Sequence, residues 1–222
     1  MVEVLFEDNH LIAINKPPGV LVQGDITGDV TLPDMVKEYI KEKYKKPGAV
    51  FLGVVHRLDR PVSGAVVFAR TSKSLERMNE LFRNRETKKI YHAIVYGKPP
   101  KSADTLIHWL VKDENRNKTT AYKRESKDGL RSELSYELVA HNNGLSLLEV
   151  RPITGRPHQI RVQLSSIGCP IKGDVKYGAE KPNDDASISL HARRLEFVHP
   201  VRKEPVTISA GYPQNHLWDS FR

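Results

Sequence analysis

The sequence predicts an α+β fold, in which a mixed, largely antiparallel central sheet is flanked by a few helices. Strand-like and helix-like segments follow one another without the regular strand–helix alternation that builds parallel sheets. Asn143 and Gly144 lie between two stretches of alternating apolar residues, which is typical of a two-residue hairpin turn. The length of 222 residues is near the upper size for one domain, and we expect a single domain over residues 1–222.

Two helices are predicted in the first half of the chain. Thr31 suits an N-cap and Pro33 suits a first helical turn, so a helix with an apolar stripe is expected over residues 31–45. A second amphipathic helix is expected over residues 72–86. Strands are predicted at residues 2–6 and 11–14 and at the apolar runs 54–55 and 65–68. The charged segment HRLDR separates the last two runs and should form a turn.

The second half of the chain is predicted to be mostly strand. Strands are expected at residues 88–97 and 189–200, with the hairpin at 132–153. A short helix is expected over residues 155–168, with Pro157 in its first position and Gly168 just past its end. The Lys-rich residues 98–127 show little periodicity, and we expect short strands on an exposed, mobile arm.

Composition narrows the class of protein. The net charge of +8 suits a polyanionic partner, because basic side chains that neutralise phosphates release counterions. No apolar run approaches the ~20 residues of a membrane span, and the first ten residues lack the pattern of a signal peptide. The one cysteine, Cys169, cannot form an internal disulfide, so we expect a cytoplasmic protein with no membrane partner.

Several catalytic motifs do not occur in the chain. It contains no CxxC, HExxH, GxxxxGK[ST] or GxSxG pattern, and its nine histidines do not cluster at the spacing of metal ligands. We therefore expect no metal and no cofactor.

Two segments concentrate candidate chemistry. Asp59 in HRLDR is either a structural ion pair with Arg57 or Arg60, or a carboxylate kept ionised for nucleophilic or base catalysis. GRPHQIR is either the solvated face of a short helix or a site where Arg161, beside His158, binds a carboxylate or phosphate. The residue types alone leave both alternatives open.

Taken together, the motifs carry a resemblance. They are KPPG, HRLDRPVSG, KKIYHAIVYG, RPITGRPHQIRVQLSSIGCPIKGDVKYG and LHARRLEFVHP, in this order. This combination resembles the RluA-type family of RNA pseudouridine synthases from about Val4 to the last strand. The resemblance implies a pseudouridine synthase fold with a central RNA-binding cleft. No N-terminal S4-like module is expected, because the KPPG strand begins near residue 1.

The resemblance also implies an activity and three catalytic residues. The family isomerises uridine to pseudouridine in RNA, in rRNA or in tRNA. Asp59 corresponds to the catalytic aspartate, which attacks the base at C6 or acts at C1′ or on the C2′ proton. Tyr91 would stack on the target base and assist removal of the C5 proton. Arg161 would form a salt bridge with Asp59.

RNA contacts are expected from the same comparison. Arg57 would take the place of the target base when that base leaves the stack. Further RNA contacts are expected from other ionisable side chains of the two motifs and of the arm: His56, Arg156, His158, Lys112, Arg116, Lys118, Lys123 and Arg124. The expected partner is an rRNA or tRNA stem-loop, with no obligate protein partner and a monomeric state.

Two other classes of function fit the residues less well. A non-catalytic RNA-binding protein could use the same basic surface, although it would not need Asp59, Tyr91 and Arg161 together. A hydrolase built on His56, Asp59 and His158 lacks a serine or cysteine nucleophile in a recognisable setting.

Overall fold

The structure is a computed structural model that describes residues 2–221, and it divides into two compact units. Unit 1 extends up to Lys89 and resumes over Ala192–Pro213. Unit 2 comprises Ile90–His191 and the residues from Gln214 onward. The chain passes from one unit to the other within two strands, β5 (Lys88–Tyr96) and β10 (Leu190–Val198), and a third time between Pro213 and Gln214. The single domain expected over residues 1–222 stays a prediction.

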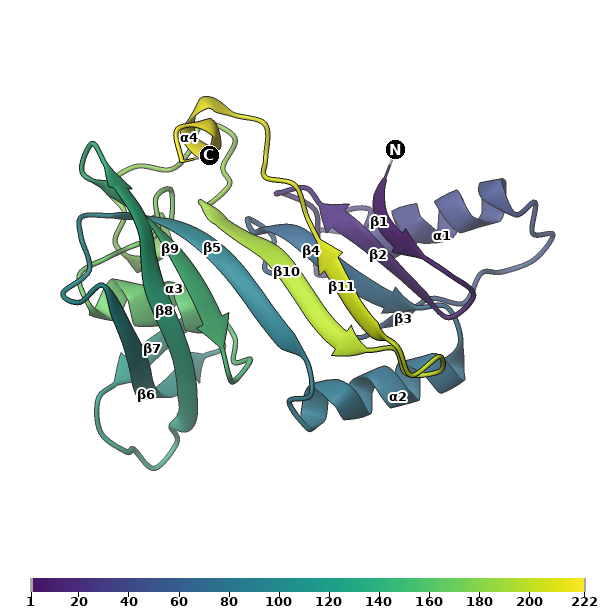
Figure 1. Ribbon diagram of the computed structural model, residues 1–222, viewed down its shortest axis with the longest axis horizontal. Helices are drawn as coiled ribbons and strands as arrows, with labels where there is room; N and C mark the ends of the chain where they lie inside the picture. Colours follow the sequence, from purple (N-terminus) through teal and green to yellow (C-terminus); the bar gives the residue numbers. More distant parts are fainter. Residues whose placement is uncertain (1, 222) are drawn as a thin grey trace. The chain divides into compact units, whose positions relative to one another are not determined.

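Both units combine antiparallel strands with few helices, which confirms the predicted α+β class (Figure 1). The other elements of unit 1 are β1 (Glu3–Glu7), β2 (Leu11–Lys16), α1 (Leu32–Lys43), β3 (Gly53–Val54), β4 (Ser63–Ala69), α2 (Ser72–Arg83) and β11 (Pro205–Ser209). Those of unit 2 are β6 (Ala103–Asp113), β7 (Lys118–Tyr122), β8 (Leu130–Asn142), β9 (Leu145–Pro152), α3 (Gln159–Ser166), the 3₁₀ helix η1 (Val175–Tyr177) and α4 (His216–Asp219). Among residues 2–221, no helix is long and apolar enough to cross a membrane.

The sheet of unit 1 has β4 near its centre. Its strand order is β1-β2-β4-β10, with β11 against β10 and β3 against β4. All seven residues of β4 are buried, as expected for a strand covered on both faces. Gly64 has φ +115°, and a Cβ there would lie 2.4 Å from the carbonyl oxygen of Ala192 in β10. A side chain at this position would therefore separate two neighbouring strands.

The helices of unit 1 begin where the sequence predicts. Thr31 caps α1 in a capping box with Asp34, and Thr71 caps α2 in the same way with Ser74. Met78 of α2 belongs to the apolar core formed with residues of β2, β4, β10 and β11. Both helices end before the predicted last residues. The final residues of each predicted segment are exposed and are not helical.

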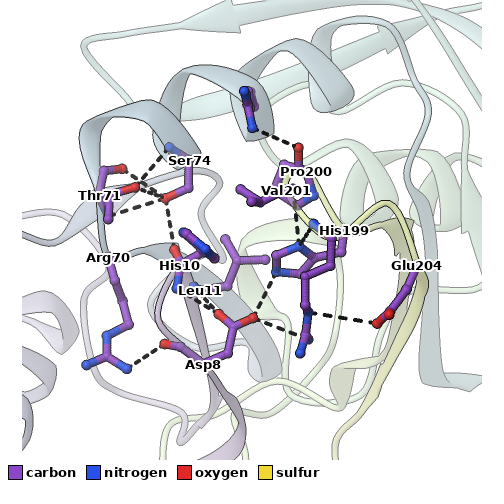
Figure 2. Close-up of polar contacts among 12 residues, drawn as sticks. Asp8, His10, Leu11, Arg70, Thr71, Ser74, His199, Pro200, Val201 and Glu204 are labelled. Carbon is purple, nitrogen blue, oxygen red and sulfur yellow. Dashed lines mark hydrogen bonds and ion pairs between the residues drawn. The ribbon is translucent and has the colours of Figure 1, made fainter.

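A polar cluster ties two turns of unit 1 together (Figure 2). The buried ring of His199 accepts hydrogen bonds at Nδ1 from the backbone N–H groups of Val201 and Arg202, so its own hydrogen lies on Nε2. This Nε2 lies 3.0 Å from Asp8 Oδ2. Asp8 Oδ1 accepts from the backbone N–H groups of His10 and Leu11, both at 2.8 Å. Burial lowers the pKa of His199, and the carboxylate of Asp8 opposes this shift.

The sheet of unit 2 is antiparallel in the order β5-β9-β8-β6-β7. Asn143 and Gly144 join β8 to β9 with φ values of 49° and 75°, which confirms the predicted two-residue hairpin turn. Ser132, Leu134 and Tyr136 alternate as buried residues along β8. The last strand, β10, is also confirmed, although β11 follows it and pairs with it.

The arm at residues 98–127 is more regular than its sequence predicts. It contains one strand of 11 residues, β6, which pairs with β8 over eight positions and with β7 over five. Leu106, His108 and Leu110 are buried in alternation along β6. The polar histidine and threonines hide this alternation in the sequence.

Helix α3 begins later than predicted. His158 adopts a left-handed conformation with φ 55° immediately before Gln159, so Pro157 lies outside the helix rather than in its first position. Gly168, with φ 79°, ends the helix as predicted. Every residue from Gln159 to Leu164 is buried. The helix therefore lies inside unit 2 and has no solvated face over these positions.

Candidate active site

Asp59 lies on a tight turn between β3 and β4. The backbone N–H of Val62 donates to the carbonyl of Asp59 at 3.0 Å, so Arg60 and Pro61 occupy the corner. Asp59 is half-buried, and Leu58 beside it is buried in unit 1. The leucine therefore anchors a charged turn that the sequence places between two apolar strands.

Lys16 supports this turn through hydrogen bonds to its backbone. Its fully buried ammonium group donates to the carbonyl of Pro17 at 2.9 Å, of Arg60 at 3.1 Å and of Val62 at 2.8 Å. These bonds use all three N–H donors of the lysine. This role of Lys16 was not predicted from the sequence. The available signal was a lysine at the end of a strand that is otherwise apolar and buried.

The charges of Lys16 and Asp59 are coupled. Burial lowers the pKa of Lys16 to about 7, whereas the negative charge of Asp59 raises it and the positive charge of Arg60 lowers it further. Asp59 therefore favours the ammonium form that the three carbonyls bind.

The arginines next to Asp59 in the sequence bind other groups. Arg60 Nε donates to the carbonyl of Gly19 at 3.0 Å, and its Nη2 pairs with Asp29 at 2.8 Å. The N–H of Gly19 donates back to the carbonyl of Arg60 at 2.8 Å, which joins the KPPG turn to the Asp59 turn. Arg57 is exposed and donates to the side chain of Gln23. Both arginines thus have hydrogen-bond or ion-pair partners in the loops at Gly19–Asp29.

His56 has a packed environment. Its Nε2 accepts from the backbone N–H of Val67 at 3.1 Å, and its ring stacks on Phe82 with the centroids 4.9 Å apart. Burial, with a smaller effect of Lys89, lowers its pKa to about 3. These observations favour a neutral side chain that supports the loop. Its expected contact with RNA stays a prediction.

Arg161 in α3 is buried and paired. Its Nε donates to Asp174 Oδ2 at 2.7 Å and its Nη2 donates to Asp174 Oδ1 at 2.8 Å, a two-pronged ion pair. Its guanidinium carbon lies 5.0 Å from the ring centroid of Tyr177. The alternative that GRPHQIR is only a solvated helix face is therefore wrong for Arg161.

The neighbouring residues of the motif lie close to the arm. His158 Nδ1 lies 2.7 Å from the hydroxyl of Tyr177, and that hydroxyl accepts the backbone N–H of Thr119 in β7 at 2.8 Å. Arg156 is exposed. In the arm, Lys118 Nζ lies 5.9 Å from the Tyr177 ring centroid. Lys112 pairs with Glu114 and Arg116 with Asp113, whereas Lys123 and Arg124 are exposed.

The predicted catalytic residues are divided between the two units. Asp59 belongs to unit 1, where it is coupled to Lys16. Tyr91 and Arg161 belong to unit 2, and Tyr91 lies opposite Val150 in the β5–β9 ladder. Their convergence on one nucleotide stays a prediction. The part of the chain described by the structure contains no group of three or more His, Cys, Asp or Glu side chains that could hold a metal ion.

Comparison with known proteins assigns the chain to the RNA-modifying isomerases that form pseudouridine. The family described as RNA pseudouridylate synthase matches residues 10–166. The chain belongs to this family, whose members isomerise uridine to pseudouridine in RNA.

Known relatives are similar over nearly the whole chain. An uncharacterized RNA pseudouridine synthase of Zymomonas mobilis is 34% identical over 95% of this chain and 94% of its own length. Ribosomal large subunit pseudouridine synthase C of Rickettsia prowazekii is 33% identical over 95% of this chain and 68% of its own. tRNA pseudouridine synthase C of Vibrio cholerae is 29% identical over 95% of this chain and 91% of its own length. The solved structure of human RNA pseudouridylate synthase domain containing 4 is 27% identical, with a TM-score of 0.80 over 96% of this chain and 89% of that one.

Proposed function

We propose that the protein isomerises one or more uridines of rRNA or tRNA to pseudouridine, with Asp59 as the catalytic aspartate. The main support is the mounting of Asp59. Two hydrogen bonds from the buried Lys16, to the carbonyls of Arg60 and Val62, hold the backbone just after Asp59. A carboxylate on a backbone that is fixed in this way suits attack on a nucleotide.

The proposed site combines Asp59 with Tyr91 and Arg161. Asp59 attacks C6 of the base, or acts at C1′ or on the C2′ proton, and the N-glycosidic bond breaks. The base then rotates and C5 joins C1′. The bond to Asp59 breaks, or C2′ regains its proton, N1 takes up a proton, and the C5 proton leaves with the help of Tyr91. Arg161 pairs with Asp59 and orients it. The reaction is an isomerisation without net oxidation or reduction, so it requires no redox cofactor.

RNA binding is proposed for the residues around these three. Arg57 enters the stack in place of the extruded uridine, at an exposed position that favours such a contact. The partner is a stem-loop of rRNA or tRNA, since the relatives include ribosomal and tRNA enzymes. Further contacts come from His56, Arg156, His158, Lys112, Arg116, Lys118, Lys123 and Arg124. The protein acts as a monomer in the cytoplasm, in keeping with its single, buried, free Cys169.

The test compares Asp59→Asn with wild type. Purified protein is incubated with transcribed rRNA and tRNA without added metal, and pseudouridine is mapped in the products. Wild type should convert defined uridines, whereas Asp59→Asn should form none and bind RNA within about threefold of wild type, because its shape is preserved. Asp104→Asn, which removes a carboxylate paired with Lys101 in unit 2, should remain active. A wild-type rate in Asp59→Asn would show that the nucleophile is misassigned.

A further inference from the structure

We propose that Asp174 and Tyr177 are positioning residues that hold the guanidinium of Arg161 in one orientation, and that Tyr177 connects Arg161 to strand β7 of the arm. The inference rests on the proposed function, in which Arg161 acts on Asp59. All the contacts that carry it lie within unit 2.

Asp174 fixes the plane of the guanidinium. Its side chain is 1% exposed, and both of its carboxylate oxygens accept from Arg161, at 2.7 and 2.8 Å. A two-pronged bond of this kind sets the orientation of the plane as well as its distance. The pair uses two of the five N–H donors of arginine, which is compatible with a second carboxylate partner.

The backbone of Asp174 is itself restrained. Its N–H donates to the carbonyl of Ile171 at 3.0 Å, and its carbonyl accepts from the N–H groups of Tyr177 at 3.0 Å and Ala179 at 3.1 Å. Ser165, one turn beyond Arg161 in α3, donates to the carbonyl of Tyr177 at 2.6 Å. The carboxylate and the helix that carries Arg161 are thus joined at two points, so the ion pair cannot shift as a flexible surface pair does.

Tyr177 covers the guanidinium and is restrained at its hydroxyl. Its oxygen accepts the N–H of Thr119 at 2.8 Å and shares a hydrogen bond with His158 Nδ1, 2.7 Å away. Burial raises the pKa of Tyr177, so the hydroxyl stays protonated. These two hydrogen bonds hold the ring beside Arg161, where its face attracts the cation.

The same tyrosine connects Arg161 to the arm. Thr119 in β7 also donates through its hydroxyl to the carbonyl of Pro157 at 3.1 Å, which ties the strand to the start of α3. Lys118, the preceding residue, lies 5.9 Å from the Tyr177 ring centroid. RNA that binds Lys118 therefore contacts the strand that restrains Tyr177.

The first measurement observes Arg161 without any RNA. In ¹⁵N-labelled protein, the Nε–H resonance of Arg161, assigned by its loss in Arg161→Lys, should exchange slowly with water. Asp174→Asn should abolish this protection, and Tyr177→Phe, which keeps the ring and removes only the hydroxyl, should weaken it. Unchanged protection in both variants would overturn the proposal.

The second measurement is a double-mutant cycle on the single-turnover rate at saturating RNA. Asp174→Asn should slow the reaction by about tenfold or more, with RNA affinity within about threefold of wild type, because a misplaced group lowers the rate more than the binding. In an Arg161→Lys background, Asp174→Asn should slow the reaction almost no further, because the guanidinium that Asp174 positions is already absent. Equal slowing in both backgrounds would contradict a role through Arg161.

A matched control removes a structural ion pair elsewhere. Asp8→Asn breaks the contacts of Asp8 with His199 and Arg202 in unit 1 (Figure 2) and should lower stability while leaving the single-turnover rate within about twofold. An equal loss of rate in Asp8→Asn would reduce the effect of Asp174→Asn to general destabilisation and overturn the proposal. A wild-type protein that forms no pseudouridine, but whose Arg161 signal still depends on Asp174, would overturn the proposed function and support the positioning of Arg161.

Discussion

At the scale of single residues, the least expected feature is the buried cation of Lys16, which binds the turn that carries Asp59. Among the residues that the structure describes, the hydrogen-bond partners of the Lys16 ammonium group are three carbonyl groups and not a carboxylate. Carbonyl oxygens stabilise an ammonium group through their dipoles, but they do not neutralise it. The charge of Asp59 then determines how easily Lys16 keeps its proton.

Removing the charge of Asp59 should therefore change the titration of Lys16. In wild type the pKa of Lys16 is lowered to about 7, mainly by burial, and Asp59 limits this shift. Asp59→Asn removes the negative charge, so the ammonium form loses support and the pKa should fall further. Titration of the lysine Cε resonances by ¹³C NMR, with Lys16 assigned through Lys16→Met, measures both midpoints.

The control for this titration is Asp104→Asn, which removes a carboxylate in unit 2 and should leave the Lys16 midpoint unchanged. A midpoint that stays near 7 in Asp59→Asn would mean that the two groups are not coupled. A wild-type midpoint near the ordinary lysine value of about 10.4 would mean that burial does not govern this group.

The sequence identifies reactive residues more readily than the residues that hold them. Asp59 and Arg161 lie in motifs whose residue types carry recognisable chemistry. Lys16 acts through backbone carbonyls of a distant turn, and carbonyls have no signature in a sequence. Asp174 and Tyr177 lie within one of the motifs, but their contacts with Arg161 depend on a short 3₁₀ helix that no periodicity predicts.

At the scale of elements, the turn chemistry was predictable and the arm was not. Asn143 and Gly144 specify their hairpin locally, because both must adopt positive φ. The length of β6 depends on pairing with β8 and on cover from α3, which are long-range conditions. The start of α3 was mispredicted because His158, which contacts Tyr177, adopts a left-handed conformation that helix propensity does not predict.

The basic residues of the arm should contribute unequally to contacts with RNA phosphates. Lys112 and Arg116 already pair with acidic neighbours, whereas Lys118, Lys123 and Arg124 are exposed and form no ion pair with the residues that the structure describes. Replacing these three residues by alanine should weaken RNA binding and reduce the slope of log Kd against log salt by about 2, because each phosphate contact contributes about 0.7–0.9. Filter binding at several salt concentrations measures the slope.

The matched control for the arm removes the same charge from unit 1. Lys41, Lys45 and Lys46 are exposed at the end of α1, and their replacement by alanine also lowers the net charge by three. The control slope should change by less than about 0.5 if the arm makes local contacts. Equal slopes in the two triple variants would mean that only overall charge matters.

At the scale of the whole molecule, the question is whether two compact units behave as one domain. Two of the three crossings between them fall inside β5 and β10, and each of these strands contributes residues to both units, whereas the third lies between Pro213 and Gln214. Separate domains are usually joined by exposed linkers rather than by strands. We therefore expect the chain to unfold as one cooperative unit, as the single-domain prediction requires.

Urea unfolding tests this expectation because the tryptophans report on one unit only. Trp109 and Trp218, the two tryptophans of the chain, both belong to unit 2, whereas far-UV circular dichroism follows both units. The two transitions should coincide at one midpoint. Hydrogen exchange adds a probe of unit 1: the buried amides of β4 and those of β9 should open with the same free energy and the same dependence on urea. If β9 opened at lower urea than β4, with the tryptophan transition preceding the dichroism, the chain would consist of two domains and the single-domain prediction would be wrong.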